Sequence, residues 1–72
     1  MPQKVSAPSI SAPKIILRLP QVVQKSGRSR ASIYADIERG MFPAPISLGE
    51  RSVGWLESEV DQWIDSRIAL RG

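Results

Sequence analysis

Four polar residues cluster within five positions near the middle of this 72-residue chain: Arg28, Ser29, Arg30 and Ser32. Arginine side chains can bind phosphates and base edges, and a serine hydroxyl can cap a helix or bind a phosphate. Ile33 and Ile37 follow, one helical turn apart, and predict a helix that begins with these polar residues. A glycine turn followed by such a helix is typical of the second helix of a helix-turn-helix. The pattern therefore predicts a protein that binds double-stranded DNA.

This helix is predicted to run from Ser29, its N-cap, to Arg39, with Gly40 ending it. On a helical wheel, the face opposite the two isoleucines carries Arg39 and three small residues, Ala31, Ser32 and Ala35. The small residues let the helix backbone approach a DNA groove closely. Tyr34 is interpreted either as a phosphate contact or as an edge of the core. The candidate DNA-binding residues of this segment are Arg28, Ser29, Arg30, Ala31, Ser32, Tyr34, Ala35 and Arg39.

Charge is distributed unevenly along the chain, which has a net charge of +3 and a pI near 10.0. Residues 14–51 carry seven basic and three acidic side chains, a balance of +4, whereas residues 52–72 carry two basic and four acidic ones, a balance of −2. Positive charge gathered on one segment is the electrostatic pattern expected of a nucleic-acid binder. By itself it is also compatible with an ordinary solvated surface.

The chain lacks the residues that several classes of protein require. It has no cysteine and no histidine, which excludes disulfides, zinc fingers, and catalysis by cysteine or histidine. Its later acidic residues follow the solvent face of a predicted helix, and its glycines lack the spacing and the lysine of a phosphate-binding loop. We therefore expect no enzymatic activity and no cofactor, metal or small-molecule ligand. No apolar run is long enough to cross a membrane, and we expect a cytoplasmic, nucleoid-associated protein.

Two further helices flank the central one. The first is predicted from Pro20 to Lys25, because proline suits a first helical turn and Gly27 can end the helix. The last is predicted to start at Ser58, with Asp61 completing a capping-box-like pair. Its apolar residues recur every three or four positions and predict a core-facing stripe of Val60, Trp63, Ile64 and Ile68.

A two-stranded hairpin is predicted between the last two helices. Apolar residues alternate with others at 46, 48, 53 and 55, on either side of a turn near Gly49. Next to a helix-turn-helix, such a hairpin forms a wing, and its tip carries Arg51, which can meet a phosphate or a minor groove. The predicted fold is mainly α with a small β-hairpin: a winged helix-turn-helix of three helices and a two-stranded wing.

One domain is predicted over residues 15–69. Residues 1–14 are rich in proline and serine, cannot bury enough apolar surface to offset their ordering entropy, and are expected to form a flexible tail. Residues 70–72 are expected to fray at the C-terminus.

The order of the motifs resembles the AlpA family of phage and prophage regulators, in the MerR-like winged helix-turn-helix group that includes small excisionases. The matching runs are Leu17-Arg18-Leu19-Pro20-Gln21-Val22, residues 26–34, Gly40-Met41-Phe42-Pro43, residues 48–55 and residues 58–64. The resemblance implies that Arg28, Arg30, Ser32 and Tyr34 belong to the recognition helix, and Arg51 and Ser52 to the wing. Ala35-Asp36 departs from the basic and aliphatic pair common in the family, which removes one phosphate contact and one core position from the helix.

The resemblance implies a sequence-specific DNA-binding transcriptional regulator of phage or integrated-element origin. Two alternatives stay open. One is an excisionase-type factor that bends DNA for a recombinase. The other is a protein-interaction module that uses an exposed apolar patch around Met41 and Phe42. Because one small winged domain makes few base contacts, further copies of the chain are expected on adjacent DNA sites.

Overall fold

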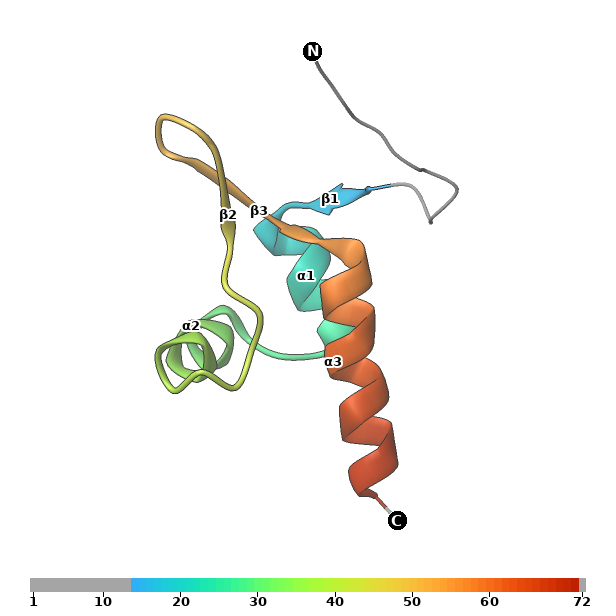
Figure 1. Cartoon of the computed structure of the whole chain (residues 1–72). Coiled ribbons are helices and arrows are strands. Elements are labelled where there is room, and N and C mark those ends of the chain that lie inside the picture. Colours follow the sequence, from blue (N-terminus) through green and yellow to red (C-terminus); the bar gives the residue numbers. More distant parts are fainter. Residues whose placement is uncertain (1–13, 72) are drawn as a thin grey trace.

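The computed structural model describes residues 14–71, and all but the last residue of the predicted N-terminal tail lies outside them. Within these residues, three helices pack against a three-stranded antiparallel sheet (Figure 1). In chain order the elements are β1 (Ile16–Leu17), α1 (Leu19–Ser26), α2 (Arg30–Glu38), β2 (Ile46–Gly49), β3 (Ser52–Leu56) and α3 (Glu57–Leu70). The predicted winged helix-turn-helix is confirmed, with one strand more than expected.

The ends of α1 and α2 follow the expected capping chemistry. Gly27 adopts a left-handed conformation (φ 75°) after α1, and its N–H donates to the Val23 carbonyl at 3.0 Å. Ser29 is the N-cap of α2, because its Oγ accepts from the Ser32 N–H at 3.2 Å. The tight turn between these two caps places the start of α2 directly after the end of α1.

The sheet has the order β1-β3-β2, so the hairpin strand β3 is its centre. Ile46 pairs with Gly54 across the hairpin, and Leu17 pairs with Trp55 on the other side of β3. Strand β1 was not predicted, because a two-residue strand is too short to show an alternating pattern. This strand ties the start of the domain to the wing, so the wing is not a free hairpin.

The expected start of α3 is wrong. The helix begins at Glu57 with Leu56 as its N-cap, and no side chain makes a capping hydrogen bond there. Asp61 instead forms an ion pair with Lys25 of α1, at 3.0 Å. The helix is continuous with β3, so the direction of the strand and this contact with α1 determine where it starts.

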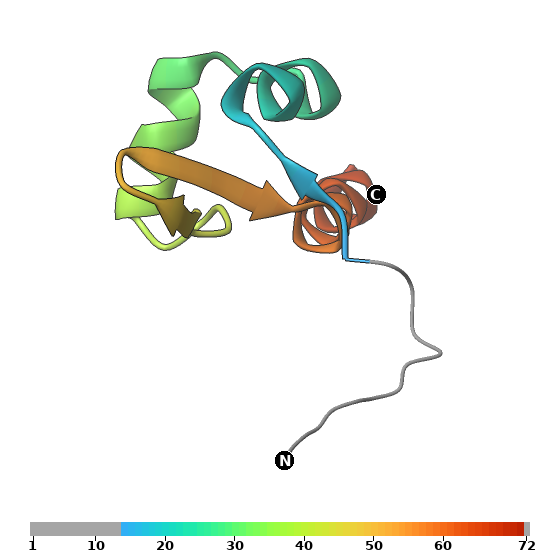
Figure 2. The same cartoon turned by 90° about the horizontal axis from the view of Figure 1, so that it is seen from above.

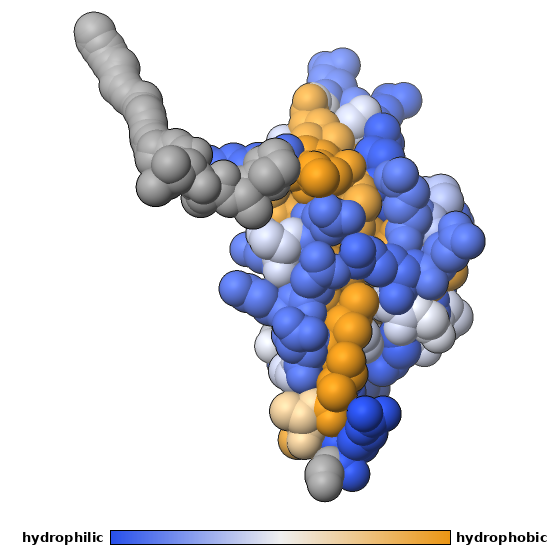
Figure 3. Space-filling view, turned by 90° about the vertical axis from the view of Figure 1, so that its right-hand side faces the viewer, coloured by the Kyte–Doolittle hydropathy of each residue, from blue (hydrophilic) through white to orange (hydrophobic). Residues whose placement is uncertain are grey.

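The apolar stripe of α3 also ends earlier than predicted. Val60 is buried and Trp63 and Ile64 pack against the core, but Ile68 is 49% exposed. Figure 3 faces the side of the molecule that α3 occupies and shows a strip of apolar surface running down it. Among residues 14–71, no helix is long and apolar enough to cross a membrane.

The core lies between the sheet and the three helices (Figure 2). Each helix contributes one or more side chains to it, and Trp55 of β3 is its largest member. The Trp55 indole N–H donates to the Pro43 carbonyl at 2.9 Å, and the Trp63 indole N–H donates to the Met41 carbonyl at 3.0 Å. The buried apolar residues are Leu17, Val22, Ile33, Phe42, Trp55 and Val60. Two tryptophans thus fix the loop that joins α2 to the wing.

Candidate nucleic-acid interface

The N-terminus of α2 presents polar groups in a fixed arrangement. Ser29 accepts from the Ser32 backbone and donates its hydroxyl to Ser32 Oγ at 3.0 Å, so both serines are engaged within the first turn. Arg30 and Ala31 lie beside them and are exposed. Ser29 is therefore primarily a cap, and Arg30 is the side chain of this turn that is open to a ligand.

The outer face of α2 is smooth, as the helical wheel indicated. Ala31 is exposed, and Ser32 and Ala35 are half-buried, so these three positions add little bulk to the face that an approaching molecule would meet. Tyr34 is 40% exposed, and its ring meets the Trp55 ring edge to face at 6.3 Å between centroids. Tyr34 thus joins the edge of the core and still presents part of its ring to solvent.

Asp36 is a buried polar residue of α2 that was not among the predicted site residues. Only 7% of it is exposed, and its two carboxylate oxygens each take a different arginine. Arg28 Nη2 lies 2.9 Å from Oδ2, and Arg39 Nη1 lies 3.4 Å from Oδ1. A signal was present in the sequence: an aspartate three residues after Ile33 occupies a position that helical periodicity gives to the core, and arginines flank the helix.

The structure therefore brings two of the candidate residues, Arg28 and Arg39, into one charged cluster around Asp36 and leaves the others apart. Arg28 is not an extended side chain in solvent but lies back along α2, with about a third of its side chain exposed. Arg39, at the C-cap, keeps 67% of its side chain exposed while it contacts the same carboxylate. Arg30 is not recorded in any ion pair within residues 14–71.

The tip of the hairpin carries the remaining candidates. Arg51 is exposed and adopts a left-handed backbone conformation (φ 59°) in the turn, and Ser52 begins β3. The tip lies on the same side of the molecule as α2 and away from α3 (Figures 1 and 2). The two groups of candidates therefore share one side of the fold, although they occupy separate elements.

Comparison with known proteins gives this fold a family. Residues 15–68 match the family model described as prophage CP4-57 regulatory protein (AlpA). The chain belongs to this family. It is 49% identical over 55 residues to the uncharacterized protein ORF88 of enterobacteria phage P4, and it spans 62% of that protein's length. It is 44% identical over 61 residues to the DNA-binding transcriptional activator AlpA of Escherichia coli K12, of which it spans 87%.

In this AlpA-family chain, the Lys25 ammonium lies at the surface and is engaged in ion pairs with two carboxylates of α3. Its Nζ lies 3.0 Å from Asp61 Oδ1 and 3.3 Å from Glu57 Oε2. Hydrogen bonds to Asp61 and then to Glu57 raise the pKa of Lys25 above its usual 10.5. The ion pairs join α1 to the N-terminal part of α3, so they fix the orientation of these two helices.

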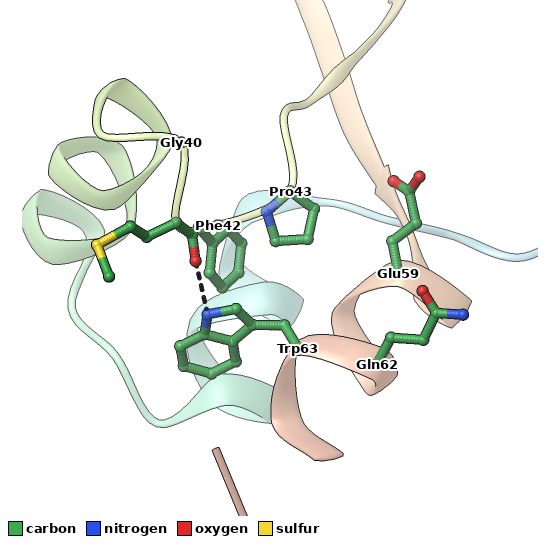
Figure 4. Close-up of a pocket in the computed structure, with 7 residues that line it drawn as sticks. Gly40, Phe42, Pro43, Glu59, Gln62 and Trp63 are labelled. Carbon is green, nitrogen blue, oxygen red and sulfur yellow. Dashed lines mark hydrogen bonds between the residues drawn. The ribbon is translucent and has the colours of Figure 1, made fainter. Parts of the chain in front are cut away.

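The expected exposed apolar patch around Met41 and Phe42 is not present, and a shallow hollow beside α3 lies there instead. Phe42 is buried, and its ring packs edge to face on Trp63 at 4.9 Å between centroids, which leaves Met41 alone exposed. The hollow, of about 370 Å³, is lined by Gly40, Met41, Phe42, Pro43, Glu59, Gln62 and Trp63 (Figure 4). The Trp63 N–H that faces it is already used by the Met41 carbonyl, and within residues 14–71 no group of acidic side chains could hold a metal ion.

Proposed function

We propose that this chain is a DNA-binding transcriptional regulator of the AlpA type. The observation that carries the proposal is its 44% identity to the Escherichia coli protein named DNA-binding transcriptional activator AlpA, over most of the length of that relative. The match includes the helices and the hairpin, because the family model extends over residues 15–68.

In the proposed mode of binding, α2 enters the major groove with its N-terminus and its outer face. The exposed Arg30 and the small residues Ala31 and Ala35 support this orientation, because they let the helix approach base edges closely. Ser32 is half-buried and within the first turn, where its hydroxyl can also reach a phosphate while Ser29 caps the helix.

The wing is proposed to contact the backbone or the minor groove next to the site read by α2. Arg51 stands at the exposed tip, on the same side of the molecule as α2 (Figure 1). The middle strand of the sheet connects the wing to β1 and to the buried Trp55, so the distance between tip and helix is fixed by the core. Ser52, at the base of the tip, is assigned to the same contact.

Affinity selection of fragmented host genomic DNA with the purified full chain tests this function. We expect discrete sites to be enriched at near-physiological salt, and Arg30→Ala to lose about 1–3 kcal/mol of binding to them. Arg67→Ala is the matched control, because Arg67 lies on α3 and its guanidinium stacks over the Trp63 ring at 6.0 Å. Absence of enriched sites would contradict the proposed function, and equal loss in both variants would contradict the proposed role of α2.

The positions of the enriched sites separate two forms of this function. Sites next to promoters support transcriptional control, whereas sites next to an attachment sequence, together with a strong bend in a bound fragment, support an excisionase-type role. We also propose that high-affinity sites hold more than one copy of the chain, since a single domain of this size makes few base contacts. Sedimentation of the protein with an enriched fragment measures the number of copies.

A further inference from the structure

The carboxylate of Asp36 lies between the two arginines that flank α2. Arg28 precedes the helix and Arg39 follows it, and each occupies a different oxygen of the same side chain. Asp36 itself is 7% exposed, so its position is set by the packing of α2 against the core rather than by solvent. Its backbone carbonyl also accepts from the Met41 N–H at 2.8 Å, which fixes the end of the helix.

This arrangement works against simple affinity for DNA. A negative charge on the helix that is proposed to enter a groove repels phosphates at every sequence, and it also occupies donors that could otherwise neutralise them. Both arginine side chains remain partly exposed, and such ion pairs add little to folding stability, because water screens their attraction. The remaining physical effect is that Asp36 orients Arg28. A guanidinium held 2.9 Å from a carboxylate oxygen cannot rotate freely toward the nearest phosphate.

We propose that Asp36 is a positioning residue for DNA selectivity, an inference that rests on the proposed function. Asp36 holds the Arg28 guanidinium in one orientation, and it restrains the Arg39 guanidinium to a lesser extent. The remaining N–H donors of Arg28 then reach a DNA acceptor only where the DNA places that acceptor correctly. The guanidinium has five donors, and the contact with Asp36 leaves the others available. Asp36 thereby lowers binding to any duplex and raises the difference between the correct site and other sequences.

The test compares wild type with Asp36→Asn on two duplexes of equal length, an enriched site and a scrambled version of it, across a series of salt concentrations. Asparagine keeps the shape of the side chain and removes its charge. We expect tighter binding to the scrambled duplex and a salt slope steeper by about one to two units, because each released arginine can neutralise a phosphate. The ratio of site to scrambled affinity should fall about five- to hundredfold.

Asp65→Asn is the charge-matched control. Asp65 is exposed on α3, and no ion pair is recorded for it within residues 14–71. This variant changes the net charge equally, so it reports the general electrostatic effect of losing one carboxylate. We expect it to leave the ratio of site to scrambled affinity unchanged.

A double-mutant cycle with Arg28→Gln provides a readout that a purely structural role would not produce. If Asp36 acts through Arg28, Asp36→Asn should have little further effect on the affinity ratio once Arg28 is replaced. Additive losses would overturn the proposal, and so would an unchanged ratio in Asp36→Asn, even with reduced thermal stability. If the wild-type chain itself does not distinguish the two duplexes, the proposed function fails rather than this inference alone.

Discussion

Replacing Gly54 by alanine is expected to destabilise the domain and to loosen the wing. Gly54 is buried in the central strand β3, opposite Ile46 of β2. A Cβ atom added there would clash with Ile16 Cγ2 and would lie 3.0 Å from Leu48 Cδ1 and 3.1 Å from the Leu17 carbonyl oxygen. All three contacts are closer than ordinary van der Waals distances, so neighbours from both flanking strands must move.

The loss of stability in Gly54→Ala depends on which of these neighbours can move. Ile16 and Leu48 are partly exposed and can rotate, at about 0.5–1.5 kcal/mol for each strained rotamer, but the Leu17 carbonyl belongs to the backbone of β1. We therefore expect a loss of about 1–3 kcal/mol, the usual range for overpacking. A domain of this size is stable by only about 3–9 kcal/mol, so the melting temperature should fall by about 4–24 °C.

Thermal unfolding followed by circular dichroism measures this effect, and fluorescence of the neighbouring Trp55 reports the local environment. Ser47→Ala is the matched control, because Ser47 is exposed on β2 and the change adds no atom to occupied space; we expect it to stay within about 0.5 kcal/mol of wild type. A Gly54→Ala protein as stable as this control would show that β1 and β2 do not close over β3, and would refute the packing described for the wing.

Four further outcomes are expected. Arg51→Ala should weaken binding to all duplexes and flatten the salt slope by about one unit; an unchanged slope would make the wing purely structural. Ser29→Ala should cost about 1 kcal/mol in urea unfolding, because the first turn of α2 loses its cap. Trp55→Phe should cost about 1–3 kcal/mol, since the Pro43 carbonyl loses its donor. The pKa of Lys25 is raised above 10.5 in the folded protein, so its ion pairs should add fully to the free energy of unfolding below that pH. This stabilisation should be lost as the pH rises through the higher folded pKa. The stability difference between wild type and Lys25→Met, measured from neutral to alkaline pH, should therefore disappear at high pH.

The sequence by itself determined the local elements. Pro20 and Gly27 delimit α1, Ser29 caps α2, and the alternation around Gly49 gives the hairpin, because each of these signals acts within a few residues. The assignment to the AlpA family also rests on short runs in a fixed order, which the family match over residues 15–68 confirms. Local chemistry was thus sufficient for the class of fold.

The tertiary structure decided what these elements do to one another. Strand β1 exists because β3 offers an edge to pair with, and the start of α3 depends on its continuity with that strand rather than on Ser58. In the candidate site, the sequence indicates Arg28 as a site residue but does not identify its partner. Asp36 lies eight positions away, and only the turn before α2 brings the two side chains together. Periodicity assigns residues to faces of one helix, whereas ion pairs and burial depend on which other elements cover those faces.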